Sequence, residues 1–372
     1  MPLTNAYLDA YNTNIDRINT CIISAVYSPD NTRLIAGDDQ GRLGLFYSSP
    51  QISMKPIFLT TLPNTYHSQI NSRTNSNNCN NNSISLASSV SEILIVVGGS
   101  IHNGLVQGYR WSDIMSNKKT QQLPSDAFSF DLARGPNEIF VCVQAPSKKQ
   151  FQKTDEIIVG SSVGTLRVLN IERQTLVTTI DAAHKGVIHQ VAFANDGKRV
   201  ASCSEDGTCK IWDLSSSSHQ PIHTIETNKW ISCCAFDMAT DRLVIGGDCP
   251  LSLWHLAMLS SSTKQKPLLV YNSIPTPIYS LALCSVDDDT ILVGGDTNKL
   301  YSIPKNGDEQ TMTISRPTTP SPIYTIATTI NKNTTKENED IKVAVAGSHW
   351  NIDSFTITET NIRKIGHYEF SK

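Results

Sequence analysis

The chain alternates short apolar runs with turns made of small and polar residues, and one version of this pattern recurs along its length. In each copy an apolar run ends in small residues, turns tightly, and is followed by a second, alternating run. Two such runs joined by a tight turn predict a β-hairpin. Seven copies are found, at residues 34–46, 95–109, 157–169, 200–212, 243–254, 291–303 and 343–355.

The spacing of the seven copies indicates a propeller. The anchoring small residues are 61, 62, 43, 43, 48 and 53 positions apart, and the shortest spacings match the roughly 40 to 45 residues of a WD40 blade. A third apolar run precedes most hairpins and a fourth follows, which gives four strands per unit. The sequence therefore predicts an all-β, seven-bladed WD40 β-propeller over residues 20–372. The anchors are Gly37, Gly98, Gly160, Cys203, Gly246, Gly294 and Gly347.

The longer spacings indicate insertions between strands. Residues 71–85 are almost entirely Asn, Ser and other polar residues, which bury too little apolar area to offset the entropy cost of ordering, so a disordered surface loop is expected. Two charged stretches, 145–155 and 331–340, are expected to be solvated loops within blades three and seven. Residues 1–19 form an N-terminal extension, where weak helical spacing predicts a short helix, with a ring-closing strand as the alternative.

Composition and charge restrict the classes of partner. The net charge of −3 and the pI near 6.3 lack the concentration of Lys and Arg that nucleic-acid binding requires, so RNA contact is expected to be indirect. Nine cysteines without a regular framework are typical of reduced thiols in the cytosol or nucleus. No apolar stretch approaches the roughly 20 residues of a membrane span, so no membrane contact is expected.

Residues 180–214 carry the most specific motif and resemble a near-complete WD40 repeat. In that family a His before the first strand, a Ser in the second, an Asp in the tight turn and a Trp in the third form a hydrogen-bonded tetrad. A buried donor or acceptor left unpaired costs about 1 to 3 kcal/mol, so linking the four groups satisfies them together. The matching residues are His184, Ser202, Asp206 and Trp212.

The same four residues contain the elements of a Ser, His and Asp nucleophilic triad. Because the sequence context assigns each member to a blade position, the structural interpretation is preferred and no catalytic residue is predicted. Cys203 and Cys209, and the adjacent pair Cys233 and Cys234, lack the paired two-residue spacing of zinc sites, so no metal site is expected. No Gly-rich phosphate loop is found, and neither a cofactor nor a small-molecule substrate is predicted.

Residues 228–256 resemble the fifth blade of the THO complex subunit six family, in which a Trp-Ile opening leads to a Gly-rich turn and a Leu-Trp-His-Leu ending. The matching positions are Trp230, Gly246, Gly247 and residues 253–256. The resemblance implies a nuclear subunit, with the cytoplasm as a second location, of the THO/TREX assembly that couples transcription to messenger RNA processing and export. It also implies a non-catalytic scaffold that docks on coiled-coil THO subunits.

Two other functions stay open at this point. A substrate receptor of a cullin ubiquitin ligase belongs to the same binding class, but its WD40 members often carry Arg two residues after the Trp-Asp pair, where this chain has Ser215. A propeller enzyme would need ionisable residues that converge on the central channel. For the scaffold, the candidate docking residues are Lys229 and Trp230, an aromatic residue beside a cation at the start of blade five. The alternative for Trp230 is packing between blades.

Overall fold

The structure is a computed structural model, and parts of the chain are described in it. The predicted N-terminal extension, residues 71–83 of the predicted loop, and most of the two charged insertions lie outside the described residues. The described residues are 20–48, 55–61, 84–89, 92–98, 105–116, 124, 126–132, 138–146, 155–216, 218–237, 239, 241–259, 265–283, 290–329, 341–357 and 362–370.

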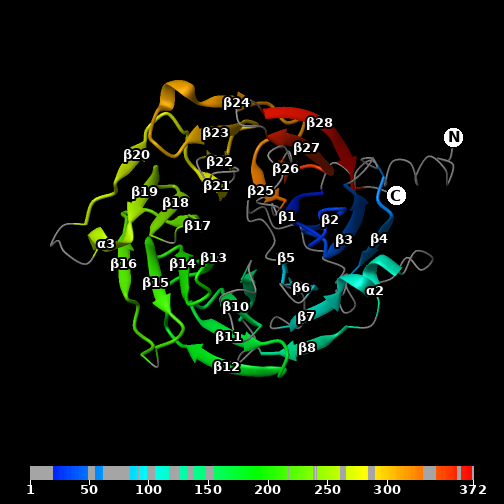
Figure 1. Ribbon diagram of the computed structural model, residues 1–372, viewed down its shortest axis with the longest axis horizontal. Helices are drawn as coiled ribbons and strands as arrows, with labels where there is room; N and C mark the ends of the chain where they lie inside the picture. Colours follow the sequence, from blue (N-terminus) through cyan, green and yellow to red (C-terminus); the bar gives the residue numbers. More distant parts are fainter. Residues whose placement is uncertain are drawn as a thin grey trace, which may run out of the picture.

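The described residues form seven four-stranded antiparallel sheets arranged radially as a ring (Figure 1). In every sheet the strand that comes first in the chain lies nearest the centre, and neighbouring innermost strands contact one another around the whole ring. The predicted seven-bladed β-propeller is confirmed. No helix in the described part of the chain is long and apolar enough to cross a membrane.

Blades one to three occupy the N-terminal half of the chain. One short helix, α2 (Trp111–Ser116), follows the third strand of blade two. The strands of blade one are β1 (Ile22–Tyr27), β2 (Arg33–Asp38), β3 (Arg42–Tyr47) and β4 (Phe58–Thr61). Those of blade two are β5 (Ile84–Ser88), β6 (Ile93–Gly98), β7 (Leu105–Arg110) and β8 (Phe128–Asp131). Those of blade three are β9 (Phe140–Gln144), β10 (Glu156–Ser161), β11 (Leu166–Asn170) and β12 (Thr175–Ile180).

Blades four to seven complete the ring, with the short helix α3 (Leu256–Leu259) in blade five and the 3₁₀ turn η2 (Glu309–Thr311) in blade six. Blade four contains β13 (Ile188–Phe193), β14 (Arg199–Ser204), β15 (Thr208–Asp213) and β16 (His223–Glu226). Blade five contains β17 (Ile231–Phe236), β18 (Arg242–Gly247), β19 (Leu251–His255) and β20 (Leu269–Tyr271). Blade six contains β21 (Ile278–Leu283), β22 (Thr290–Gly295), β23 (Leu300–Pro304) and β24 (Thr313–Ser315). Blade seven contains β25 (Ile323–Thr328), β26 (Ile341–Gly347), β27 (Asn351–Ile357) and β28 (Ile362–Glu369).

Burial explains why the strands differ in composition. The second strand of a blade, such as β10 or β14, is buried over its last five residues because neighbouring blades cover both of its faces. A strand covered on both faces is a continuous apolar run and does not alternate. The outermost strand β12 is the edge strand of its sheet, where it pairs with β11, and its first three residues are exposed.

The recurring small residue marks the place where one blade meets the next. A methyl group built on Gly294 of β22 would lie 2.5 Å from Ile323 Cγ2, the first residue of the innermost strand of blade seven. Gly37 of β2 faces Ile84 of the next blade in the same way, at 2.8 Å. The glycine therefore leaves room for the first isoleucine of the following blade, which sets the radial packing.

The predicted loop at 71–85 extends two residues too far. Ile84 and Ser85 belong to β5, where Ile84 is buried and Ser85 Oγ accepts a hydrogen bond of 3.1 Å from the Val143 N–H. The apolar character of Ile84 and the pairing of the strand with β6 outweigh the polar composition of the tract that precedes it.

The ring closes by packing between blades seven and one. Among the described residues, the sheet of blade seven contains only β25 to β28, and β1 contacts β25 and β26. The Phe46 ring lies 5.2 Å from that of Tyr368 and 6.2 Å from that of Phe370. Lys342 Nζ of blade seven donates to the carbonyl of Ser48 at 2.7 Å. Aromatic packing and a polar contact therefore join the two ends of the propeller.

Candidate protein-docking site

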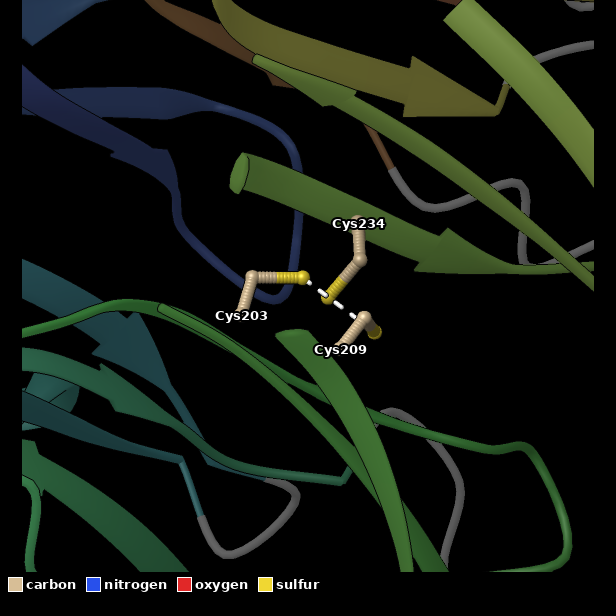
Figure 2. A group of neighbouring side chains, drawn as sticks. All are labelled: Cys203, Cys209 and Cys234. Atoms are coloured by element: carbon tan, nitrogen blue, oxygen red, sulfur yellow. Dashed lines mark hydrogen bonds between the residues drawn. The ribbon is translucent and has the colours of Figure 1, made fainter. Parts of the chain in front are cut away.

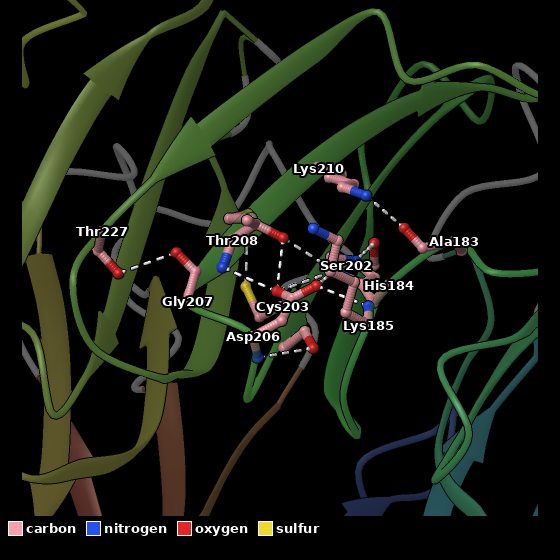
Figure 3. A network of polar contacts seen from close by, with 12 residues as sticks. Ala183, His184, Lys185, Ser202, Cys203, Asp206, Gly207, Thr208, Lys210 and Thr227 are labelled. Carbon is pink, nitrogen blue, oxygen red and sulfur yellow. Dashed lines mark hydrogen bonds and ion pairs between the residues drawn. The ribbon is translucent and has the colours of Figure 1, made fainter.

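The structure brings the four residues singled out in blade four into one chain of hydrogen bonds. Figure 3 shows three of them, His184, Ser202 and Asp206. The Nε1–H of Trp212 in β15 donates to the Oγ of Ser202 in β14 at 2.8 Å. That Oγ lies 2.7 Å from Nε2 of His184, which lies in the loop before β13. The other ring nitrogen of His184 is 3.2 Å from a carboxylate oxygen of Asp206, in the turn between β14 and β15.

Burial determines the protonation of this chain. It lowers the pKa of His184 to about 4, so the ring is neutral at pH 7. Because Nδ1 faces the carboxylate, the single ring proton lies on Nδ1 and Nε2 accepts from the Ser202 hydroxyl. Burial raises the pKa of Asp206, but hydrogen bonds from Thr208 Oγ1 at 2.6 Å and from the Lys185 N–H at 2.9 Å outweigh it and lower that pKa.

The order Ser202, His184, Asp206 reproduces the connectivity of a nucleophilic triad, yet the environment is that of a core. Ser202 is 0% exposed and His184 is 2% exposed. A nucleophile must reach a substrate, and this Oγ is enclosed while it accepts the indole N–H of Trp212. The geometry therefore favours a structural role, in which the chain joins the loop before β13 to the hairpin of β14 and β15.

In blades one and three, other residues connect the third strand to the segment before the innermost strand. Arg42 of β3 bridges the Asp38 carboxylate, at 2.6 Å, and the Thr20 hydroxyl, at 2.7 Å, in the segment before β1. In blade three, Arg167 of β11 pairs with Glu138, just before β9, at 2.8 Å, and both side chains are almost fully buried. Each pair fixes the segment that enters the innermost strand.

In blade seven, a carboxylate fixes the segment before the innermost strand. Asp353 of β27 accepts hydrogen bonds from the Thr318 hydroxyl at 2.7 Å and from the Thr319 N–H at 2.9 Å, in the segment before β25. Sequence reasoning missed these anchors because they share no motif. A charged residue inside an otherwise apolar strand run, such as Arg167 in LRVL, was the signal that pointed to them.

The structure also gathers three cysteines between blades four and five (Figure 2). The sulfur atoms of Cys203, Cys209 and Cys234 lie within 4.8 Å of one another, and Cys203 Sγ is 3.4 Å from Cys209 Sγ. All three side chains are buried in the apolar cluster that contains Ile231 and Leu243. Burial raises the pKa of Cys203, so its thiol is protonated and packs as a small apolar group.

The innermost strands surround a central cavity of about 270 Å³. Near the start of five of these strands the pairing register skips one residue, a β-bulge that re-aims the extra side chain. All five bulged residues line the cavity, and they are Ile23, His189, Ser232, Tyr279 and Tyr324. The bulge is a cross-strand feature, so the sequence pattern alone did not identify these residues.

Lys229 and Trp230 lie beside one end of this cavity, in the loop between β16 and β17. Lys229 is 55% exposed, and its Nζ is 3.0 Å from the carboxylate of Asp248. The half-buried Trp230 ring stacks on Tyr279, with centroids 6.1 Å apart and planes at 22°, and lies 6.0 Å from the His189 ring. Tyr279 in turn contacts Tyr324 at 5.5 Å. Trp230 is thus part of an aromatic row at the mouth of the channel.

Comparison with known proteins agrees with this architecture. Residues 174–213 match the family model described as WD domain, G-beta repeat. That stretch contains all four residues of the blade-four chain, within a closed ring of seven four-stranded sheets. The structure is a seven-bladed β-propeller of the WD40 type, with a recognisable WD repeat in blade four. The resemblance of blade four to a WD40 repeat is thereby confirmed.

This WD40 propeller is also similar to THO complex subunit 6 proteins, as the sequence motifs indicated. It is 25% identical over 261 residues to the THO complex subunit 6 homolog of Rattus norvegicus, covering 67% of this chain and 69% of that protein. It is 30% identical over 122 residues to THO complex subunit 6 of Homo sapiens, covering 30% and 34%. It is 26% identical over 169 residues to the DDB1- and CUL4-associated factor 13 of Dictyostelium discoideum, covering 43% and 36%.

Proposed function

We propose that this propeller is a non-catalytic docking subunit of a THO-type assembly that acts in nuclear messenger RNA processing and export. The similarity to the rat THO complex subunit 6 homolog carries the proposal, because it extends over two thirds of both chains. A shared WD40 fold alone would not distinguish one scaffold from another. The expected partners are coiled-coil THO subunits, with RNA reached through them.

The enclosure of Ser202 and the lining of the channel support a scaffold. Among the described residues that line the cavity, most are apolar, hydroxyl or amide side chains, with one histidine and no carboxylate, lysine or arginine. A propeller enzyme would need convergent acid, base or nucleophilic groups there. Binding, and not catalysis, is therefore the proposed role.

Affinity purification of the tagged full chain from nuclear extract, followed by mass spectrometry, tests the assignment. THO subunits should co-purify in amounts comparable to the tagged chain and should remain bound after nuclease treatment, because RNA does not bridge them. Recovery of cullin-ligase components in place of THO subunits would overturn the assignment and favour the alternative. The match to the Dictyostelium factor supports that alternative over less than half of this chain.

We further propose that Lys229 and Trp230 belong to the docking surface. Trp230→Ala should reduce capture of THO subunits by the folded protein while the melting temperature changes little, since the ring lies at the channel mouth and contacts other half-buried rings. If Trp230 serves only to hold blades together, the variant should lose about 3 to 5 kcal/mol of stability and its folded fraction should capture normally.

Lys229→Ala tests the cation separately. It should weaken capture, whereas Lys198→Ala, which removes another exposed lysine from the turn between β13 and β14 at the opposite end of the blade, should not. Equal capture by both lysine variants would place the docking surface elsewhere.

A further inference from the structure

The mouth of the central channel presents a continuous aromatic surface. Blades four to seven contribute one ring each, and successive rings lie 5.5 to 6.1 Å apart. All four residues are half-buried, so part of each ring faces solvent. Burial lowers the pKa of the single histidine, so the row carries no positive charge at pH 7. The rings belong to His189, Trp230, Tyr279 and Tyr324.

Acidic residues lie in turns at the same end of the propeller as this aromatic row. In blades one, three, four, five, six and seven, one residue in the turn after the second strand donates its N–H to the carbonyl of the residue just before the innermost strand. This contact fixes the residue beside the channel mouth. Four of the six are acidic, and three of those lie on the consecutive blades four, five and six. The six residues are Asp39, Ser162, Glu205, Asp248, Asp296 and Ser348.

One of these acidic residues is already paired with a cation. The ammonium of Lys229, the residue before Trp230, lies 3.0 Å from the Asp248 carboxylate. Glu205 and Asp296 are exposed, and within the described residues neither forms an ion pair. Lys299 lies in the same turn as Asp296, and Lys185 lies in the loop before β13, but no ion pair joins either to these carboxylates in the described part of the chain. Two acidic groups beside the aromatic row thus remain open to an incoming cation.

We propose that the channel mouth binds an arginine side chain from an extended segment of a protein partner, with the guanidinium on the aromatic row and its N–H groups toward one of the exposed carboxylates, Glu205 or Asp296. This inference rests on the proposed docking function and names the chemistry of the partner. A guanidinium stacks on aromatic faces and donates charge-assisted hydrogen bonds to carboxylates, and it is more weakly hydrated than an ammonium.

The volume of the cavity and the charge of the acidic residues at its mouth favour an arginine side chain. The cavity of about 270 Å³ is below the roughly 300 to 1,000 Å³ of small-molecule sites, which favours insertion of a single side chain. Phosphates of an RNA would approach the same carboxylates with like charge, which is unfavourable. The stacked rings of Trp230 and Tyr279, at 6.1 Å, leave no space between them, so the guanidinium stacks on the row and not between its members.

Fluorescence anisotropy with the full chain tests the inference. The probe is a labelled Gly-Ser peptide that carries two arginines, compared with the same peptide carrying citrulline, which keeps the shape and loses the charge. The arginine peptide should bind at least about tenfold more tightly than the citrulline peptide. Equal binding of the two would overturn the proposal, as would tighter binding of a single-stranded RNA oligonucleotide.

Two sets of variants locate the site. The exposed pair Glu205→Gln and Asp296→Asn should weaken binding by roughly two- to fivefold per charge without affecting folding. Glu172→Gln, in the turn between β11 and β12 at the opposite end of its blade, is the matched control and should bind as wild type. Trp230→Ala should weaken binding by about tenfold or more. Unchanged binding by the carboxylate pair refutes the proposal even if Trp230→Ala fails to fold.

The outcome is separable from that of the proposed function. If the chain co-purifies with THO subunits but does not distinguish the arginine peptide from the citrulline peptide, the proposed function is supported and the arginine site is refuted. If the chain binds the arginine peptide but does not assemble with THO subunits, the arginine site is supported and the proposed function is refuted.

Discussion

Ser202→Ala is the sharpest test of the blade-four chain, because this hydroxyl lies at its centre. The substitution removes the acceptor of the Trp212 indole N–H and the donor to His184 Nε2. The three side chains are between 0% and 3% exposed, so water cannot replace the lost partner. Two buried groups left unpaired cost about 1 to 3 kcal/mol each, so a loss of roughly 2 to 6 kcal/mol is expected.

Asp206→Ala should cost less. The Asp206 side chain is 9% exposed, and Thr208 Oγ1 lies 2.9 Å from His184 Nδ1 and can accept its proton. A loss of about 1 to 3 kcal/mol is expected. At about 2.1 cal/mol/K per residue, the unfolding entropy of 372 residues is near 0.8 kcal/mol/K, so the melting temperature should fall by about 3 to 8 °C for Ser202→Ala and about 1 to 4 °C for Asp206→Ala.

Thermal and denaturant unfolding, monitored by circular dichroism and by tryptophan fluorescence, measure both losses. Ser218→Ala is the matched control, because Ser218 is exposed in the same blade and should change stability by no more than about 0.5 kcal/mol. If Ser202→Ala melts at the wild-type temperature, or if Asp206→Ala is the more damaging variant, the network does not contribute as the hydrogen bonds indicate.

Three further outcomes are expected. Because burial lowers the pKa of His184 to about 4, from about 6.5 in the unfolded chain, the unfolded state binds this proton first, so the free energy of unfolding should fall between pH 6.5 and 4, and less steeply in His184→Gln. Cys203, Cys209 and Cys234 should resist iodoacetamide until the protein unfolds, as mass spectrometry of the alkylated peptides would show. Phe370→Ala should cost about 3 to 5 kcal/mol in urea unfolding, because its ring fills the seam between blades seven and one.

The fold was predictable because its repeating contact leaves a mark on the sequence. At Gly37, Gly160 and Gly294, where the first isoleucine of one blade meets the second strand of the preceding blade, an added Cβ would lie 2.5 to 2.8 Å from that isoleucine. A small residue is therefore favoured at this position, and blade four has Cys203 there. Small residues therefore recur at blade-length intervals. The end of the Asn-rich tract was less predictable, since Ile84 and Ser85 are recruited into β5 by pairing with β6, which lies beyond any local pattern.

The site was predictable only in part. His184, Ser202, Asp206 and Trp212 follow a motif within one blade, and they lie in contact. The aromatic row required knowledge of which blades are neighbours and where bulges turn a side chain inward, as they do for Tyr279 and Tyr324. The cysteine cluster likewise joins β14 and β15 of blade four to β17 of blade five. The spacing of the cysteines along the chain does not reveal that these strands are neighbours.

The anchors of the different blades show why a propeller retains its shape while its motifs diverge. The segment that leads from one blade into the innermost strand of the next must be fixed to the blade that it enters. Any buried pair of groups with matched charge or matched hydrogen-bonding capacity can fix it. Blade one uses Arg42 with Thr20, blade three uses Arg167 with Glu138, and blade seven uses Asp353 with Thr319. Exchanging only one member of a pair leaves a buried polar group without its partner, whereas exchanging both leaves none. Anchors should therefore be replaced as pairs, which is why the repeats of this ring differ in residue type and agree in geometry.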